Sequence, residues 1–387
     1  MLRSMLHRLP VALALLVFAA AHAALAQVTP PSIAARSWLL LDVTTGQVLA
    51  AHEPDTKIEP ASLTKVMTAY LAFNALKEKR LTPDQRPPVS PAAYKAIGSR
   101  MFVDPLKPAT VEELLNGMIV QSGNDASIVL AEALAGSEDT FAQQMNREAQ
   151  RLGLRNTQFR NSTGLPDPQH YTTARDLATL AARLIVDHPD YYPLYSRRDY
   201  TFNNIRQPNR NRLLAIDPSV DGMKTGHTDA AGYCLIASAH RKQPGVEGER
   251  RLVSVVIGTS SESARAIESQ KLLNYGFQNF DVVRIYAKGQ PAGSYQVWKG
   301  AANTIAGGFD GELAVSVPRG QADKVKAEIE RVQPLVAPIA QGQKIGTLRV
   351  KVEDKLLIER PLIALATVEP AGWFGRTWDG LRMMLAK

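Results

Sequence analysis

The feature that most constrains the fold is a continuous apolar run that follows Pro60. The eight residues from Val66 to Phe73 read Val-Met-Thr-Ala-Tyr-Leu-Ala-Phe and leave no wide polar face. A helix built from such a run has to be buried on most of its sides. Pro60 and Ser62 are residue types that favour a helix start. We therefore expect a buried helix that begins near residue 60 and organises the rest of the chain.

Two polar residues stand at the start of this helix. Ser62 and Lys65 are three positions apart, so their side chains share one face. A lysine in a buried helix is costly unless it has a partner or a chemical role. A hydroxyl beside an amine is the minimal pair for nucleophilic catalysis, because the amine can take the proton as the oxygen attacks. The alternative is a helix cap with a lysine that reaches water, and the tetrad alone favours that alternative because Ser-x-x-Lys is common by chance.

Length and charge limit the class of protein. The 387 residues suit two domains. The formal charge is +8, and removal of Arg3 and Arg8 with the leader described next leaves about +6. This modest excess suits attraction to anionic surfaces such as membranes or cell-wall polymers. Since no basic run is interleaved with aromatic residues, we expect no nucleic-acid partner.

Residues 1–26 have the layout of a secretory signal peptide. A basic start precedes the apolar run Val11 to Ala21, and Ala24-Leu25-Ala26 supplies a small-x-small cleavage site. The sequence therefore predicts export. The single cysteine, Cys234, excludes an intramolecular disulfide. It lies in an apolar run and is expected to be a core residue.

Residues 27–280 are predicted to form an α+β domain, an antiparallel sheet covered by helices. A hairpin is expected from two runs around Thr44-Thr45-Gly46, and Leu81 to Pro91 is expected to be a loop with a possible strand. Ser122-Gly123-Asn124 is expected to be a short turn between two helices. The expected helices are 111–119, 126–133, 141–152, 174–186 (with Thr173 as its cap) and 262–277, and the expected late strands are 220–228, 232–239 and 251–258.

The end of the chain has a different texture. Residues 281–368 alternate short β-branched runs with glycine, proline and charge, which predicts a small all-β domain; 325–332 could be a short helix or an edge strand. Residues 369–387 predict an amphipathic helix that gathers Trp373, Phe374 and Trp378 on one side and arginines on the other. This pattern suits a membrane interface. The alternative is a helix docked on the protein itself.

Three short motifs now stand in order along the chain: Ser62-Leu63-Thr64-Lys65, Ser122-Gly123-Asn124 and Lys224-Thr225-Gly226. Each is weak alone, but their order, spacing and expected local structure agree. With these motifs the chain resembles the low-molecular-mass penicillin-binding proteins that act as D-alanyl-D-alanine carboxypeptidases. The resemblance covers essentially the whole mature chain, because residues 220–228 are close to that family's strand signature and the last two regions look like its β domain and membrane anchor.

The resemblance implies a role for each site residue. Ser62 is the nucleophile, and Lys65 is the base, which must be neutral and therefore needs a pKa lowered by burial and a nearby cation. Ser122 relays a proton to the leaving amine, and Asn124 orients Lys65 and holds a substrate amide. Lys224 is the expected cation and attracts the substrate carboxylate.

The remaining implied residues bind substrate. The backbone N–H groups of Ser62 and His227 are expected to hold the oxyanion. Thr225 belongs to the same strand, and Gly226 lets a peptide lie along it as an added edge. Arg210 and Arg265 are expected near the site. The resemblance implies no metal or organic cofactor, peptidoglycan stem peptides as substrate, β-lactams as covalent inhibitors, and a periplasmic enzyme held peripherally on the inner membrane by the C-terminal helix.

Three alternatives stay open. A β-lactamase shares these motifs, but the class A enzymes need a glutamate between the second and third motifs, and none occurs from Ala149 to Val246. A cell-wall D,D-endopeptidase uses the same chemistry, although the β domain and tail favour the carboxypeptidase. An inactive cell-wall binding protein would not need the intact motif residues.

Overall fold

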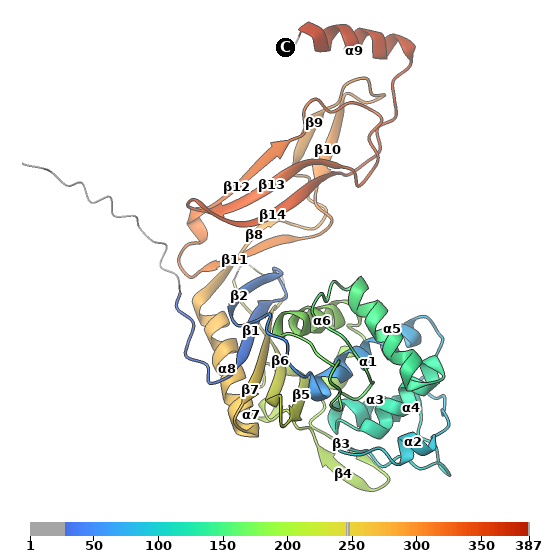
Figure 1. Ribbon diagram of the computed structural model, residues 1–387. Coiled ribbons are helices and arrows are strands. Elements are labelled where there is room, and N and C mark those ends of the chain that lie inside the picture. Colours follow the sequence, from blue (N-terminus) through green and yellow to red (C-terminus); the bar gives the residue numbers. More distant parts are fainter. Residues whose placement is uncertain (1–27, 245, 247, 386–387) are drawn as a thin grey trace, which may run out of the picture.

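The computed structural model describes residues 28–244, 246 and 248–385. The predicted signal peptide, residues 1–26, lies outside this part of the chain. Figure 1 shows an elongated molecule, with a mixed domain at one end, a smaller β domain stacked on it, and helix α9 (Trp373–Leu385) at the far end. The α+β domain, the all-β domain and the tail helix are all present in the predicted order.

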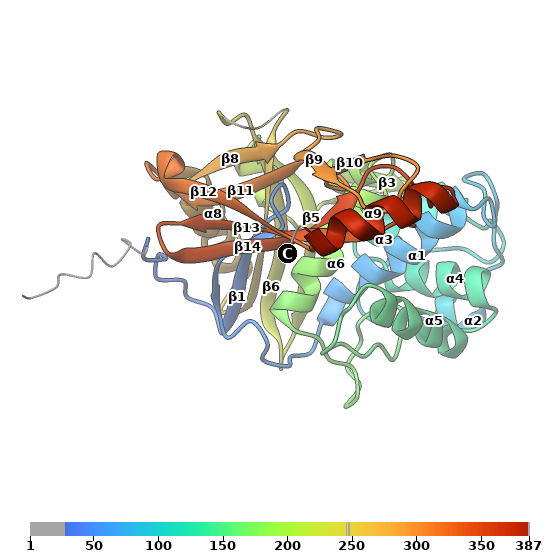
Figure 2. The same ribbon diagram turned by 90° about the horizontal axis from the view of Figure 1, so that it is seen from above.

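The mixed domain is built on a five-stranded antiparallel sheet with strand order β2-β1-β7-β6-β5. Both figures show this sheet between helix α8 on one side and a block of helices on the other (Figures 1 and 2). Alternate residues of β1 follow this arrangement, since Leu39 joins the core under the helical block and Leu40 joins the core under α8. The strands are β1 (Ser37–Asp42), β2 (Gln47–His52), β5 (Val220–Thr228), β6 (Gly232–Arg241) and β7 (Arg250–Thr259).

The helical block surrounds α1 (Lys65–Lys77), which is buried along most of its length as predicted. Thr110 caps α3 in a reciprocal capping box with Glu113, and Thr173 caps α6 as expected. The other helices are α2 (Pro91–Tyr94), α3 (Val111–Val120), α4 (Asn124–Ala135), α5 (Glu138–Arg151), α6 (Ala174–Asp187), α7 (Leu213–Ile216) and α8 (Glu262–Asn279), with 3-10 turns η1 (Ala61–Thr64), η2 (Tyr192–Ser196) and η3 (Ala322–Lys324).

Several details differ from expectation. The described residues 81–90 form no strand. The chain enters α1 through the 3-10 turn η1, and Asn124 is already the first residue of α4. The hairpin of β3 (Asp199–Phe202) and β4 (Ile205–Pro208) was not predicted, because each strand has only four residues and the alternation of Asp-Tyr-Thr-Phe does not continue into β4.

The β domain contains a second five-stranded sheet in the order β12-β13-β14-β10-β9, and a β11-β8 pair packs against it. Of the two structures expected for residues 325–332, the edge strand is the one found, since β12 pairs only with β13 in this sheet. The strands are β8 (Phe280–Tyr286), β9 (Gly293–Gln296), β10 (Thr304–Gly308), β11 (Leu313–Pro318), β12 (Val325–Arg331), β13 (Lys344–Val352) and β14 (Lys355–Ala364).

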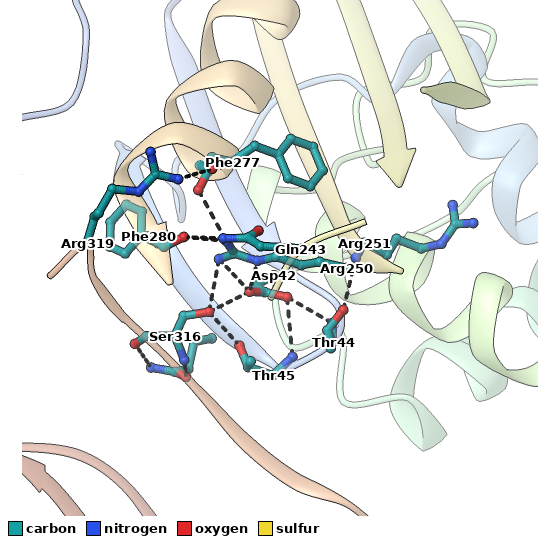
Figure 3. A network of polar contacts seen from close by, with 12 residues as sticks. Asp42, Thr44, Thr45, Gln243, Arg250, Arg251, Phe277, Phe280, Ser316 and Arg319 are labelled. Atoms are coloured by element: carbon teal, nitrogen blue, oxygen red, sulfur yellow. Dashed lines mark hydrogen bonds and ion pairs between the residues drawn. The ribbon is translucent and has the colours of Figure 1, made fainter. Parts of the chain in front are cut away.

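A buried polar network joins the two domains (Figure 3). Arg250 of β7 is fully buried and binds Asp42 of β1 at 2.8 Å. Ser316 of β11, in the β domain, donates to the same Asp42 oxygen at 2.5 Å and accepts from Arg250 at 3.1 Å. The carbonyl of Phe280 accepts a further bond from Arg250 at 2.8 Å. One guanidinium thus connects the main sheet, the end of α8 and the β domain.

Helix α9 is docked on the end of the β domain. The carboxylate of Asp379 accepts from the backbone N–H of Lys299 at 2.7 Å, and the Lys299 carbonyl accepts from Ala371 at 2.8 Å. The large apolar side chains of α9 remain exposed, among them Trp373, Phe374, Trp378, Leu381 and Met384. Among the described residues, no helix combines the length and apolar content needed to cross a bilayer.

Candidate active site

The sequence-predicted pair Ser62 and Lys65 is brought together by the step from η1 to α1. Ser62 lies on the 3-10 turn and Lys65 is the first residue of the helix. The Lys65 Nζ lies 2.9 Å from the Ser62 Oγ. Lys65 is only 1% exposed, so it does not reach water as the alternative interpretation required.

The other two contacts of Lys65 decide how its amine is oriented. Its Nζ donates to Asn124 Oδ1 at 2.7 Å and to the Thr163 carbonyl at 2.6 Å. Both partners are acceptors. The Thr163 group is a backbone carbonyl, and the Asn124 group is the amide oxygen, since the Asn124 amide nitrogen donates to the Ile97 carbonyl. A neutral amine has two N–H bonds and one lone pair. In the neutral form, with both N–H bonds committed to these two oxygens, the lone pair is left to accept a proton from the Ser62 hydroxyl.

Burial is the main electrostatic influence on Lys65, followed by the positive charge of Arg210; together they lower its pKa to about 7, against the opposing charges of Asp125 and Glu138. The sequence had named Lys224 as the responsible cation. The pKa of Lys224 itself lies well below its usual range, because of burial and then the charges of Lys65 and Arg210. Arg210 thus disfavours the charge of both buried amines, and Lys65 also disfavours the charge of Lys224.

The turn between α3 and α4 supplies Ser122 and Asn124. Ser122 has a φ of 62°, an unusual value for a residue other than glycine, and its Oγ is buried with no hydrogen-bond partner in residues 28–244, 246 and 248–385. A buried hydroxyl without a partner is costly, which marks a place where a ligand atom can bind. The predicted turn is correct for Ser122 and Gly123, whereas Asn124 is held within the first turn of α4.

Strand β5 carries the third motif along the free edge of the main sheet. Lys224 and Thr225 are buried, and His227 is exposed with its ring 4.1 Å from that of Tyr233. Gly226 packs so closely on η1 that a Cβ there would lie 3.1 Å from Leu63 and 3.3 Å from Ala61. The glycine thus brings the strand against the serine turn, a reason that the sequence did not reveal.

The two expected arginines reach the site in different ways. Arg265 of α8 is buried and donates to the Gly226 carbonyl at 3.3 Å, so it supports the back of β5. Its pKa is lowered, first by burial. Arg210, in the exposed segment after β4, acts on Lys65, Lys224 and Arg265 through its charge.

The backbone carbonyl of Thr163 is the site component that sequence reasoning missed. Asn161 Oδ1 accepts from the N–H groups of Thr163 and Gly164, and this Asx turn directs the Thr163 carbonyl at Lys65. Gly164 has a φ of +84°, and a Cβ there would lie 1.7 Å from the Ala61 carbonyl oxygen. The Asn-Ser-Thr-Gly sequence was a signal for such a turn, although not for its target.

Glu138 also belongs to these surroundings. Like Glu132 and Glu148, Glu138 lies between the second and third motifs, ahead of the glutamate-free stretch from Ala149 to Val246. Its carboxylate accepts from the backbone N–H and the hydroxyl of Ser162, at 2.9 and 2.5 Å. It is thus committed to holding the loop that carries Thr163.

In the part of the chain that the structure describes, no group of three or more histidine, cysteine or acidic residues could hold a metal ion. Cys234 is a buried core residue, and burial raises the pKa of its thiol to about 11.

This geometry can be set beside known proteins. The family described as D-alanyl-D-alanine carboxypeptidase matches residues 24–261, and the family described as penicillin-binding protein 5, C-terminal domain, matches residues 280–370. The chain belongs to the D-alanyl-D-alanine carboxypeptidase family. The first match covers the three motifs of the mixed domain, and the second covers the β domain.

Two of the similar proteins cover most of this chain, and a third covers a shorter part of it. The D-alanyl-D-alanine carboxypeptidase DacC of Escherichia coli is 42% identical over 94% of this chain and 91% of its own length. The crystal structure of penicillin-binding protein 5 from Haemophilus influenzae superposes with a TM-score of 0.83 at 39% identity, over 88% of this chain and 99% of that one. Penicillin-binding protein D2 of Listeria monocytogenes in an ampicillin-bound form is 28% identical, with a TM-score of 0.58, over 65% of this chain and 100% of its own.

Proposed function

We propose that this protein is a serine D-Ala-D-Ala carboxypeptidase that removes the terminal D-alanine from peptidoglycan stem pentapeptides through an acyl-enzyme. The observation that carries the proposal is the position of the Lys65 Nζ, 2.9 Å from Ser62 and bonded to two oxygens that can only accept. A pKa of about 7 leaves much of this amine neutral near neutral pH. It is therefore prepared to act as a base toward Ser62.

The reaction starts when the Ser62 Oγ attacks the carbonyl carbon between the two D-alanines and Lys65 takes the hydroxyl proton. The backbone N–H groups of Ser62 and His227 donate to the developing oxyanion. The terminal carboxylate of the substrate is the counter-charge that favours protonation of Lys224, and the positive charge of Arg210 adds to the attraction. Thr225 and Gly226 contribute the strand edge along which the peptide pairs, and Arg265 keeps that edge in place through the Gly226 carbonyl.

The proton held by Lys65 then passes through the Ser122 hydroxyl to the departing amine, and the C–N bond breaks. The unpartnered Oγ of Ser122 supports this relay, because the substrate nitrogen would complete its hydrogen bonding. Asn124 keeps Lys65 oriented and has a second amide N–H for the substrate. Water attacks the acyl-enzyme, the reverse proton transfer occurs, and the shortened peptide leaves.

Intact-mass measurement after incubation with penicillin tests the nucleophile. We expect a covalent adduct of one penicillin, and we expect none in Ser62→Ala. An adduct that persists in Ser62→Ala would refute the assignment. Release of D-alanine from a pentapeptide, compared with cleavage of a cross-linked dimer, then separates the carboxypeptidase from an endopeptidase and from an inactive binding protein.

We also propose an exported, membrane-associated arrangement, with a signal peptide at 1–26, a catalytic domain at 27–280, a β domain at 281–368 and an anchoring helix at 369–387. The exposed apolar side chains of α9 support peripheral attachment to the periplasmic face of the inner membrane. Deletion of Trp373 to Lys387 is expected to release the mature protein from lipid vesicles in sedimentation. Continued sedimentation of the truncated protein would show that another surface binds lipid.

A further inference from the structure

The loop of residues 97–103 is fastened to the active-site turn by backbone hydrogen bonds. The side chain and the backbone N–H of Asn124 bind the carbonyls of Ile97 and Ser99, each at 2.7 Å. The next residue, Asp125, is buried and accepts from three consecutive N–H groups of the loop, those of residues 101 to 103, at 2.7 to 3.1 Å. Two consecutive residues of α4 thus hold the 97–103 loop in one conformation.

This rigid loop presents apolar side chains to solvent. Ile97 is 69% exposed and Phe102 is 42% exposed, whereas Met101 and Val103 on either side of Phe102 are buried. Phe102 has a φ of 69°, a strained conformation for an aromatic residue. The Asp125 carboxylate holds this conformation through the N–H groups of residues 101 to 103.

Charge and a second element complete this surface. The Arg100 guanidinium lies over the Phe102 ring, 5.0 Å from its centre. The β3–β4 hairpin supports the loop from below in Figure 1, because Gln207 donates to the Arg100 carbonyl at 3.2 Å. The same hairpin leads directly to Arg210, whose charge acts on both site lysines.

The 97–103 loop lies on the side of the candidate active site opposite strand β5. Ser62 and Lys65 lie between β5, which packs on η1 through Gly226, and the Ser122–Asn124 turn. A peptide that pairs with the free edge of β5 therefore has the turn, and the loop fastened to it, on its other side. The two terminal D-alanines are small and would occupy the space at Ser62 and Lys224. The larger side chains of the loop are then available to contact the substrate residues that precede the two D-alanines.

We propose that the 97–103 loop is the second wall of the substrate groove and selects the acyl-donor peptide beyond its terminal D-alanines. Ile97 and Phe102 contact aliphatic parts of that peptide, and Arg100 attracts a carboxylate carried on it. This inference rests on the proposed carboxypeptidase function. It adds that the 97–103 loop sets the preference for the length and charge of the peptide.

The test compares a stem pentapeptide with N-acetyl-D-Ala-D-Ala in Phe102→Asn, Ile97→Ser and Arg100→Gln. Asparagine tolerates a positive φ, so Phe102→Asn keeps the backbone. We expect the preference for the pentapeptide, as a ratio of the two kcat/KM values, to fall roughly tenfold in Phe102→Asn. The matched control is Leu106→Ser, since Leu106 is 94% exposed and lies outside the loop. It should leave the ratio unchanged.

Acylation by a penicillin nucleus that lacks an acyl side chain separates the possible failures. If the wild-type protein forms no adduct at Ser62 and releases no D-alanine, the proposed function fails. If the wild-type protein reacts and the loop variants retain the wild-type preference ratio, the loop does not select substrate. A variant that has lost its fold is recognised because it no longer reacts with the penicillin nucleus.

Discussion

Of the long basic side chains that the structure describes, two are the most deeply buried, Lys65 in the candidate active site and Arg250 at the junction of the domains. Both are essentially inaccessible to water. Removal of a charge from water costs several kcal/mol unless partners compensate for it. Partners compensate for the charge of Arg250, whereas Lys65 has a lowered pKa. The comparison separates a side chain with a structural role from one with a proposed chemical role.

Arg250 is compensated in full. It binds the carboxylate of Asp42 through two nitrogens, and its other bonds go to Ser316, Gln243 and the carbonyls of Gly276 and Phe280. Asp42 in turn accepts from Thr44 and Thr45. These bonds fix the geometry of four chain segments around one guanidinium.

Lys65 is bonded only to neutral oxygens. In the described ranges no salt bridge includes Lys65 or Lys224. The cost of burial is avoided because the amine gives up its proton easily, with a pKa of about 7. An incompletely compensated lysine is therefore suited to the proposed proton exchange with Ser62.

The largest expected effect comes from replacing the uncompensated charge. Lys65→Met should lower the rate of acylation by penicillin about 10²- to 10⁴-fold, because Ser62 loses its base. The free energy of unfolding should stay the same or rise, since a buried amine is replaced by an apolar chain of similar length. Stopped-flow acylation and urea unfolding measure the two quantities. A variant that acylates at the wild-type rate would exclude Lys65 as the base.

The reverse pattern is expected for the compensated charge. Arg250→Met leaves the Asp42 carboxylate buried without its partner and should cost about 3–5 kcal/mol in the free energy of unfolding. The acylation rate of the folded fraction should not change. Arg319→Met is the control, because Arg319 is an exposed arginine at the same junction and should cost about 1 kcal/mol or less. Equal losses of unfolding free energy in Arg250→Met and Arg319→Met would contradict the structural role assigned to Arg250.

The third expected effect is a pH dependence. Acylation needs neutral Lys65, so its rate should rise about tenfold per pH unit below 7 and level off above this value. Between pH 7 and about 10.5 the unfolded chain binds a proton that folded Lys65 does not, so the free energy of unfolding should increase with pH. Lys65→Met should weaken this increase, while Lys224 retains part of it. A rate that is flat from pH 5.5 to 9 would contradict the assigned pKa.

Sequence reasoning found the parts of the site that are side chains at characteristic spacings. Ser62, Lys65, Ser122, Asn124 and Lys224 were all named, and the structure joins Lys65 directly to Ser62 and Asn124. The Thr163 carbonyl was not found, because the direction of a backbone group depends on the turn that carries it. Every residue has a carbonyl, so composition gives no sign of which one faces a lysine.

Prediction of the fold from the sequence had the same limit, since it depended on apolar patterns along the chain. The buried helix, the hairpin of β1 and β2 and the late strands followed from apolar patterns. The β3–β4 hairpin carries only a short alternation, Asp-Tyr-Thr-Phe in β3, with none in β4. A further signal was Asn203-Asn204, where both residues have positive φ values of 47° and 61° as tight hairpin turns require. The pairing of Asp42 with Arg250 was equally hidden, because nothing local links residues so far apart.

The junction around Arg250 has a consequence for how the chain folds. Asp42 and Ser316 are 274 positions apart in the chain, and Arg250 stands between them. The ion pair needs only the first domain, but the hydroxyl that completes it comes with β11. Until β11 docks, the pair can be hydrated, and an ion pair in water has little desolvation to overcome. The desolvation cost of the ion pair therefore arises only when the β domain is in place, and hydrogen bonds from that domain offset it.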